Sequence, residues 1–415
     1  MSTFCKQTAL ACFFCVTAVF SVFAASPAAE YGQAKTEALC AWMSMAAYGD
    51  RPGQLARREL ARQGWQLDAQ VQKDAKSEAK FHIATKGTAT VLTVAGTASL
   101  ADVKSDLNFH SIAYDGSTGK AAKAADMRKV HAGFDYYTKT LLAAPYGGAT
   151  VVDTLTAAAK APGTLTLTGH SLGGAVATLA GARLADRGVS RLYVVTFGAP
   201  AVGNKPFNDV YQQRLHLDRI VMKGDPVQGA LQNISASYGQ FPDKHEWQPS
   251  PVVRRFAHDM VGYADTALHR YYDAKEAYEK SLGHALKEGE IKTAGPAVWV
   301  LPLTVTADDA LASDIPYWQK ALDDQLRSRI HAGFAPKTQT LTEALREARK
   351  NGCTQVLIRS VTAKQLKNKD WDFRLTYEET TYDAVTGCLL TSTAKTTDTQ
   401  KMTPIEVLLD LGGRR

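Results

Sequence analysis

The chain has 415 residues, of which 45% are hydrophobic and 21% are charged, a composition typical of globular proteins. Its length allows two or three domains, each with its own core. The net charge of +7 is small and spread along the chain, so it does not indicate a nucleic-acid partner.

The N-terminal segment has the pattern of a secretion signal. Lys6 supplies a positive charge, Thr8 to Ala25 is apolar and uncharged, and small residues follow at its end. We predict a signal peptide over residues 1–25 and a secreted or periplasmic protein. A retained membrane anchor is the alternative, because the apolar run is just long enough to span a bilayer.

Three of the six cysteines lie in this signal segment, which leaves Cys40, Cys353 and Cys388. Their wide spacing is wrong for a zinc site. An exported protein can form a disulfide between Cys353 and Cys388, but three separate thiols fit the sequence equally well.

Strands alternate with helices through the first two thirds of the chain, which predicts βαβ units and a mainly parallel sheet. The predicted helices cover 33–47, 54–63, 131–143, 152–160, the run that ends at 185, and 259–286. The predicted strands cover 81–85, 90–95, 164–168, 192–197 and 220–223. The break at residues 292–296 (Lys-Thr-Ala-Gly-Pro) predicts a domain boundary.

The tail beyond this break has a different pattern. It predicts a smaller α/β sandwich domain over 297–415 with a mostly antiparallel sheet. No cluster of acids, bases or metal ligands is evident in it. Its predicted strands cover 297–305, 354–361, 373–379 and 389–397, and its predicted helices cover 318–330 and 341–351.

The run from Thr166 to Ala175 reads Thr-Leu-Thr-Gly-His-Ser-Leu-Gly-Gly-Ala and places Ser171 between a strand and a helix. Glycines at 169 and 173 allow a sharp turn, which exposes the serine hydroxyl at the end of a sheet. Free N–H groups at the start of the helix can stabilise an oxyanion there. We therefore interpret Ser171 as a nucleophile.

A serine needs a base and an acid, and in α/β-hydrolase folds these follow it in the order acid, then histidine. Asp225 comes directly after a predicted strand, so its carboxylate is expected at the active-site edge of the sheet. The alternative is a turn aspartate before Pro226. His258 directly precedes a predicted helix and is the preferred base, with His269 as the alternative.

Six motifs in order resemble the class 3 lipases, the fungal-lipase-like branch of the α/β hydrolases, across residues 35 to 275. They are Val94–Thr97 with the following residues 100–107, His131-Ala-Gly-Phe134, Gly169–Gly174, Thr196–Asn204, Asp225-Pro-Val227 and His258-Asp-Met-Val-Gly-Tyr263. The resemblance implies an α/β-hydrolase domain over 26–291, an oxyanion hole from Thr97 and the Leu172 backbone N–H, and a structural role for His131. We expect His170 to pack in the elbow.

The resemblance also implies a lid helix over Ser99 to Phe109. Leu100, Val103 and Leu107 lie on one face of this helix, which can either cover an apolar cleft and open at a lipid surface or pack permanently. The tail resembles small α/β domains of bacterial envelope assembly proteins, in its Ala-rich helix, its Gly-Cys pair and the run Tyr382 to Gly387. That resemblance hints at a Gram-negative origin and at an envelope protein as partner.

The sequence therefore predicts an exported serine hydrolase that cleaves carboxylic esters of lipids, of triacylglycerol lipase or phospholipase type. Its expected partner is a lipid or ester substrate at a lipid–water interface, and no metal or cofactor is expected. The alternative is a catalytically idle hydrolase fold that serves as an envelope binding module.

Overall fold

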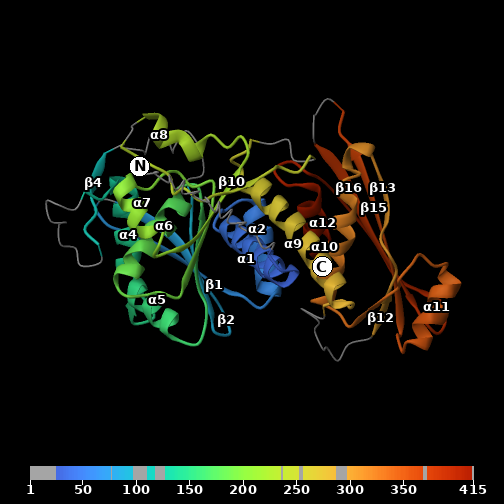
Figure 1. The fold of residues 1–415 in the computed structure, drawn as a ribbon. Helices are drawn as coiled ribbons and strands as arrows, with labels where there is room; N and C mark the ends of the chain where they lie inside the picture. Colours follow the sequence, from blue (N-terminus) through green and yellow to red (C-terminus); the bar gives the residue numbers. More distant parts are fainter. Residues whose placement is uncertain are drawn as a thin grey trace, which may run out of the picture.

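The computed structural model describes residues 25–75, 77–96, 110–116, 127–234, 237–251, 256–286, 297–367 and 372–413. Two large sheets, each with its own helices, make up most of the described part of the chain (Figure 1). The helices are α1 (Pro27–Ala46), α2 (Arg51–Arg62), α4 (Ala132–Ala143), α5 (Val151–Lys160), α6 (Leu172–Asp186), α7 (Lys205–Tyr211), α8 (Ala230–Ile234), α9 (Met260–Leu282), α10 (Ile315–Arg327), α11 (Leu341–Lys350) and α12 (Pro404–Gly413). The strands of the larger sheet are β1 (Gln66–Lys73), β2 (Glu78–Lys86), β3 (Ala89–Val94), β8 (Leu165–His170), β9 (Leu192–Phe197), β10 (His216–Met222) and β11 (His245–Trp247).

The larger sheet has the order β1-β2-β3-β8-β9-β10-β11. Strands β1 to β3 form an antiparallel meander, and the pairs from β3 to β11 are all parallel. This confirms the predicted α/β-hydrolase fold with a mainly parallel sheet. Two short hairpins lie outside the sheet, formed by β4 (Ser111–Ala113) with β5 (Lys129–His131) and by β6 (Pro145–Tyr146) with β7 (Ala149–Thr150).

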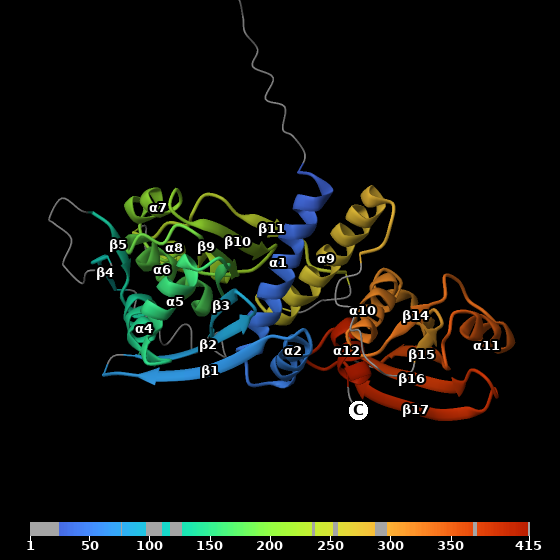
Figure 2. The same cartoon turned by 90° about the horizontal axis from the view of Figure 1, so that it is seen from below.

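Helices cover both faces of this sheet, and its central strands β3, β8 and β9 are therefore largely apolar on both sides (Figure 2). Val91 and Val195 belong to the core that contains α1 and α9, whereas their neighbours Leu92 and Val194 belong to the core that contains α4, α5 and α6. Successive side chains of a strand point to opposite faces, so each parallel strand contributes to two cores.

The tail forms a second sheet in the order β14-β12-β15-β16-β17, with β13 also paired to β15. Its long ladders are antiparallel and its short ones are parallel. The strand predicted over 297–305 is divided into β12 and β13 around Pro302, which has no N–H to donate to the ladder. Its strands are β12 (Val298–Val300), β13 (Thr304–Ala307), β14 (Ala332–Phe334), β15 (Gln355–Gln365), β16 (Phe373–Asp383) and β17 (Leu389–Asp398).

The tail packs directly on the first part of the chain, as Figures 1 and 2 show for α10 and α12 beside α2 and α9. One hydrophobic core contains Leu60 of α2 and Leu268 of α9 together with Trp318 of α10 and Ile405 of α12. Polar contacts add to it, since the buried Asp410 carboxylate of α12 pairs with two arginines of α2.

Some boundaries differ from the predicted ones for local reasons. Helix α9 ends at Leu282 instead of continuing to residue 286, because Gly283 takes the left-handed conformation (φ 74°) that commonly ends a helix. Strands β1 and β11 and helix α12 were not predicted. Among the described residues Cys40, Cys353 and Cys388 are all free thiols, and none of the helices described is long and apolar enough to cross a membrane.

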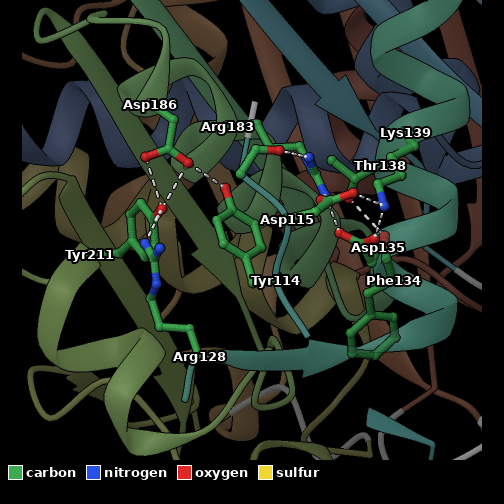
Figure 3. A network of polar contacts seen from close by, with 11 residues as sticks. Tyr114, Asp115, Arg128, Phe134, Asp135, Thr138, Lys139, Arg183, Asp186 and Tyr211 are labelled. Carbon is green, nitrogen blue, oxygen red and sulfur yellow. Dashed lines mark hydrogen bonds and ion pairs between the residues drawn. The ribbon is translucent and has the colours of Figure 1, made fainter. Parts of the chain in front are cut away.

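A buried ion network fixes α6, the helix that begins beside Ser171 (Figure 3). The Arg183 guanidinium on α6 lies 2.5 Å from Asp135 on α4 and 2.7 Å from Asp115 in the segment after β4. Lys139 bridges the same two carboxylates at 2.8 and 2.7 Å. These contacts hold the carboxyl half of α6 against α4, so the other end of the helix has a fixed position on the sheet.

Candidate active site

Ser171 lies at the sharp turn between β8 and α6 that the sequence predicts. Its backbone has a positive φ of 59°, with ψ −128°, which is uncommon for a residue other than glycine. A Cβ atom at position 169 would approach Gly173 C to 2.4 Å, and one at position 173 would approach Val94 O to 2.2 Å. The two glycines are therefore needed for the close approach of strand and helix.

Ser171, His258 and Asp225 form one hydrogen-bonded chain. His258 Nε2 lies 2.9 Å from Ser171 Oγ, and His258 Nδ1 lies 2.8 Å from Asp225 Oδ2. A carboxylate only accepts, so Nδ1–H donates to Asp225 and Nε2 accepts from the serine hydroxyl. All three side chains are buried. The fold thus joins the predicted nucleophile, base and acid from the ends of β8 and β10 and the start of α9.

Asp225 is fixed by two further hydrogen bonds. The Tyr263 hydroxyl donates to Oδ2 at 2.7 Å, and the backbone N–H of Val227 donates to Oδ1 at 2.8 Å. The Met222 N–H donates in turn to the Tyr263 oxygen at 2.8 Å. Burial, reinforced by the Asp225 charge, raises the pKa of Tyr263 well above its usual value, so the phenol keeps the proton that it donates.

Gly198 has no side chain, and this leaves room for the contact between Asp225 and His258. A Cβ atom there would lie 2.5 Å from Asp225 Oδ2 and 3.0 Å from His258 Nδ1, and the backbone has φ +57°. Gly198 lies in the Thr196–Asn204 motif, which by itself indicates no role for it. A glycine directly after a predicted parallel strand is the signal that could have indicated one.

His170 links the elbow to the backbone of His258. Its Nε2 lies 2.8 Å from the His258 carbonyl oxygen, and its Nδ1 lies 2.6 Å from the Tyr48 hydroxyl. Burial, together with the neighbouring His258, holds the pKa of His170 well below its usual value. The neutral ring donates from Nε2 to the carbonyl and accepts at Nδ1 from the tyrosine. Its expected packing role therefore includes two polar contacts.

The remaining predicted residues fall into three groups. Leu172 is the first residue of α6, where a backbone N–H has no partner within the helix. Thr97 and the lid segment 99–109 lie outside the described residues. His131 is buried and caps α4, where its Nδ1 accepts from the Phe134 N–H at 3.3 Å, and burial lowers its pKa to about 4.

His269, the alternative base, is not brought to Ser171. It lies on α9 with Nε2 at 2.7 Å from Asp314 Oδ1 and Nδ1 at 3.9 Å from Asp265 Oδ2. A second group of two carboxylates and a histidine, Glu37, Asp218 and His245, lies near the amino ends of β10 and β11. The latter two line an apolar cavity of about 650 Å3. Either group could hold a cation.

One protein family model matches part of this chain. Residues 91–232, which include Ser171 and Asp225, match the family model described as lipase (class 3). A lipase of Caenorhabditis elegans, ZK262.3, is 45% identical over 65 residues, a match that spans 15% of this chain and 18% of that protein.

Similar solved structures also carry lipase names. The lipase from Rhizopus microsporus var. chinensis is 24% identical, with 52% of this chain and 74% of that chain covered and a TM-score of 0.42. Lipase II from Rhizopus niveus is 22% identical, with 55% and 83% covered and a TM-score of 0.42. M37 lipase is 16% identical, with 60% and 92% covered and a TM-score of 0.41. The match of the family model thus relates the segment from residue 91 to residue 232 to the class 3 lipases.

Proposed function

We propose that this protein is an exported serine hydrolase that cleaves carboxylic esters of lipids. The observation that carries the proposal is the hydrogen-bonded chain from Ser171 through His258 to Asp225, at 2.9 and 2.8 Å. The relation to class 3 lipases supports the substrate class. A triacylglycerol and a phospholipid are both within that class.

In the proposed reaction Ser171 Oγ attacks the ester carbonyl while His258 Nε2 accepts its proton. The proton then passes to the leaving alcohol, and an acyl-serine remains for hydrolysis by water. Asp225 orients the imidazole and stabilises its charged form. The Leu172 N–H and Thr97 bind the developing oxyanion.

Covalent labelling tests the nucleophile. A fluorophosphonate should modify Ser171 stoichiometrically, because an activated serine attacks phosphorus as it attacks a carbonyl. Ser171→Ala is the control and should give no adduct by mass spectrometry. A folded protein that takes no label would favour the alternative function described below.

Two histidine variants test the base. We expect His258→Ala to lower kcat by about 10⁴-fold or more on a soluble ester, as loss of a general base does in serine hydrolases. His269→Ala should keep most of the activity, because its ring contacts Asp314 rather than Ser171. The reverse pattern would refute the assignment of His258.

The proposal includes the place where the enzyme acts. Residues 1–25 are proposed as the signal peptide of a secreted or periplasmic enzyme, and N-terminal sequencing of the exported protein tests this.

The proposal also includes action at a lipid–water interface. If 99–109 is a mobile lid, activity should rise sharply once a short ester exceeds its solubility, and Leu100→Asp with Leu107→Asp should reduce that rise. A substrate panel across acyl length and head group would separate lipase from phospholipase action.

The second candidate function is an idle hydrolase fold that binds an envelope protein through the tail. The observation that favours it is the exposed apolar tip between β16 and β17, where Val385, Leu389 and Leu390 are 73%, 57% and 46% exposed. Exposed apolar patches often mark protein interfaces. Retention of envelope proteins by the wild type, lost in Val385→Ser with Leu389→Ser, would support this role for the tail.

We propose residues 26–291 as the hydrolase domain and 297–415 as a second domain. A chain that ends at Ile291 should still hydrolyse a soluble ester, because all proposed catalytic groups precede the break. Its unfolding free energy should fall, since the apolar side chains of α2 and α9 lose their cover. A folded but inactive truncated chain would contradict the division.

A further inference from the structure

Three ionisable side chains meet where α9 contacts the start of α10. Asp265 and His269 are four residues apart and therefore lie on the same face of α9. Asp314 directly precedes α10, with Oδ1 at 2.7 Å from His269 Nε2. Both carboxylates are fully buried, and the histidine side chain is 15% exposed.

The polar atoms of this cluster have few hydrogen bonds. Among the described residues, neither carboxylate oxygen of Asp265 has a partner of standard geometry, although the Thr403 side chain lies close by. His269 Nε2 and Asp314 Oδ1 form an ion pair with each other at 2.7 Å and have no further partner among the described residues. Buried polar atoms without partners are rare in folded proteins, and a bound ion is one way in which they are satisfied.

The charges in the cluster do not balance. Two buried carboxylates face one imidazole, so the ionised carboxylates outnumber the single group that can carry a positive charge. Buried charges in proteins are paired or coordinate metals, and a bound cation would compensate this excess.

We propose that Asp265, His269 and Asp314 bind one divalent first-row transition-metal ion. Their ligand atoms all lie within 4.8 Å of one another. A nitrogen with two carboxylate oxygens is a ligand set typical of zinc and its neighbours, whereas calcium and magnesium prefer oxygen alone. Asp314 keeps Oδ1 for the metal, because its Oδ2 accepts from Trp318 Nε1 at 2.5 Å.

The ion would join the two parts of the chain. Asp265 and His269 belong to the helix that follows His258, and Asp314 belongs to the tail. His269 is also stacked on Tyr317 of α10, with ring centroids 4.0 Å apart, so it is already held at this junction. Metal binding should therefore stabilise the contact between α9 and α10, independently of whether the serine is active.

The other cluster supplies a matched control. Glu37 already accepts hydrogen bonds from Gln33 and Arg270, and His245 is 51% exposed. Its charges are thus better compensated, and an ion there would be held less tightly. His245→Gln therefore removes a histidine from a similar set of residues without changing the proposed site.

The experiment uses the full-length protein, purified without a metal-affinity tag, stripped with a chelator and titrated with Zn²⁺ in a calorimeter. We expect one tight Zn²⁺ per chain and a higher Tm in its presence. His269→Gln should abolish this binding, whereas His245→Gln should retain it. Absence of tight Zn²⁺ binding to the wild type, or its loss in His245→Gln and not in His269→Gln, would overturn the proposal.

A second variant is available should His269→Gln fail to fold. Asp265→Asn keeps the side-chain shape and should lower the affinity for Zn²⁺ at least about tenfold. An unchanged affinity in Asp265→Asn would also overturn the proposal.

Discussion

The Tyr263 hydroxyl donates a hydrogen bond to Asp225 Oδ2, the same oxygen that accepts from His258 Nδ1. Tyr263 therefore holds the acid in the orientation in which it can hold the base. It does not contact Ser171 within hydrogen-bond distance, so we regard it as a positioning residue.

Tyr263→Phe should lower kcat and leave KM nearly unchanged. The lost bond is to a charged group, worth about 1.5–3 kcal/mol, which corresponds to a decrease of roughly tenfold or more. Steady-state kinetics on a soluble ester give the two constants. Tyr271→Phe, on the same helix, is the control and should match the wild type. A change in KM alone would count against a positioning role.

Gly198→Ala should inactivate the enzyme, because the new Cβ would lie 2.5 Å from Asp225 Oδ2 and displace the acid. Displacement of a catalytic group by about 1 Å can cost 100-fold in rate. Gly188→Ala is the matched control, since it has a similar backbone (φ +83°) with no atom within 4 Å of the added carbon. The control should lose about 1 kcal/mol of stability and no activity. Equal loss of activity in both variants would refute the steric explanation.

His131 should make the fold less stable in acid. Its pKa in the fold is about 4, against 6.5 for an exposed histidine, so the unfolded chain binds more protons between these values. Stability is therefore full above pH 6.5 and falls as the pH drops towards 4, with a slope of up to about 1.4 kcal/mol per pH unit. Urea unfolding at several pH values measures the slope.

His131→Asn should flatten that slope, because asparagine can still cap α4 but does not titrate. Exposed His284→Asn is the control and should leave the slope unchanged. A slope that His131→Asn does not alter would assign the acid sensitivity to other groups, among them His170.

Arg183→Met should destabilise the protein by about 3 kcal/mol, because it leaves two carboxylates without their buried guanidinium. Arg187→Met is the matched control, at the residue that directly follows the same helix. Arg187 is 36% exposed and pairs with the exposed Asp153, so its loss should cost under about 1 kcal/mol. Denaturant unfolding compares the two, and similar losses would mean that the network contributes little.

The elbow and the strands beside it were predictable from sequence because they are local. The strand from Leu192 to Phe197 has the predicted bounds, and Ser171 lies at the predicted turn. A backbone that must turn sharply requires glycine close by, and this requirement is visible in the chain itself. The order of the motifs also separated His258 from His269 as the candidate base before any contact was known.

Strand β1, strand β11 and helix α12 were not predicted. Strand β1 does alternate apolar Leu67, Ala69 and Val71 with polar residues, a local strand signal that the prediction missed, and β2 supplies its hydrogen bonds. Helix α12 is short and buried on nearly every side, so its only polar side chains, Glu406 and Asp410, give a weak helical period.

Contacts between distant segments were decided only by the tertiary structure. The sequence does not indicate that Tyr263 contacts Asp225 or that Asp314 contacts His269. The residues of each pair lie on different elements, and their distance depends on how those elements pack. The sequence by itself determined the local turn, the strand and helix periods and the order of the catalytic groups, because these depend on neighbouring residues. The tertiary structure decided which side chains share a proton or a charge, because hydrogen bonds and ion pairs depend on distances that packing sets.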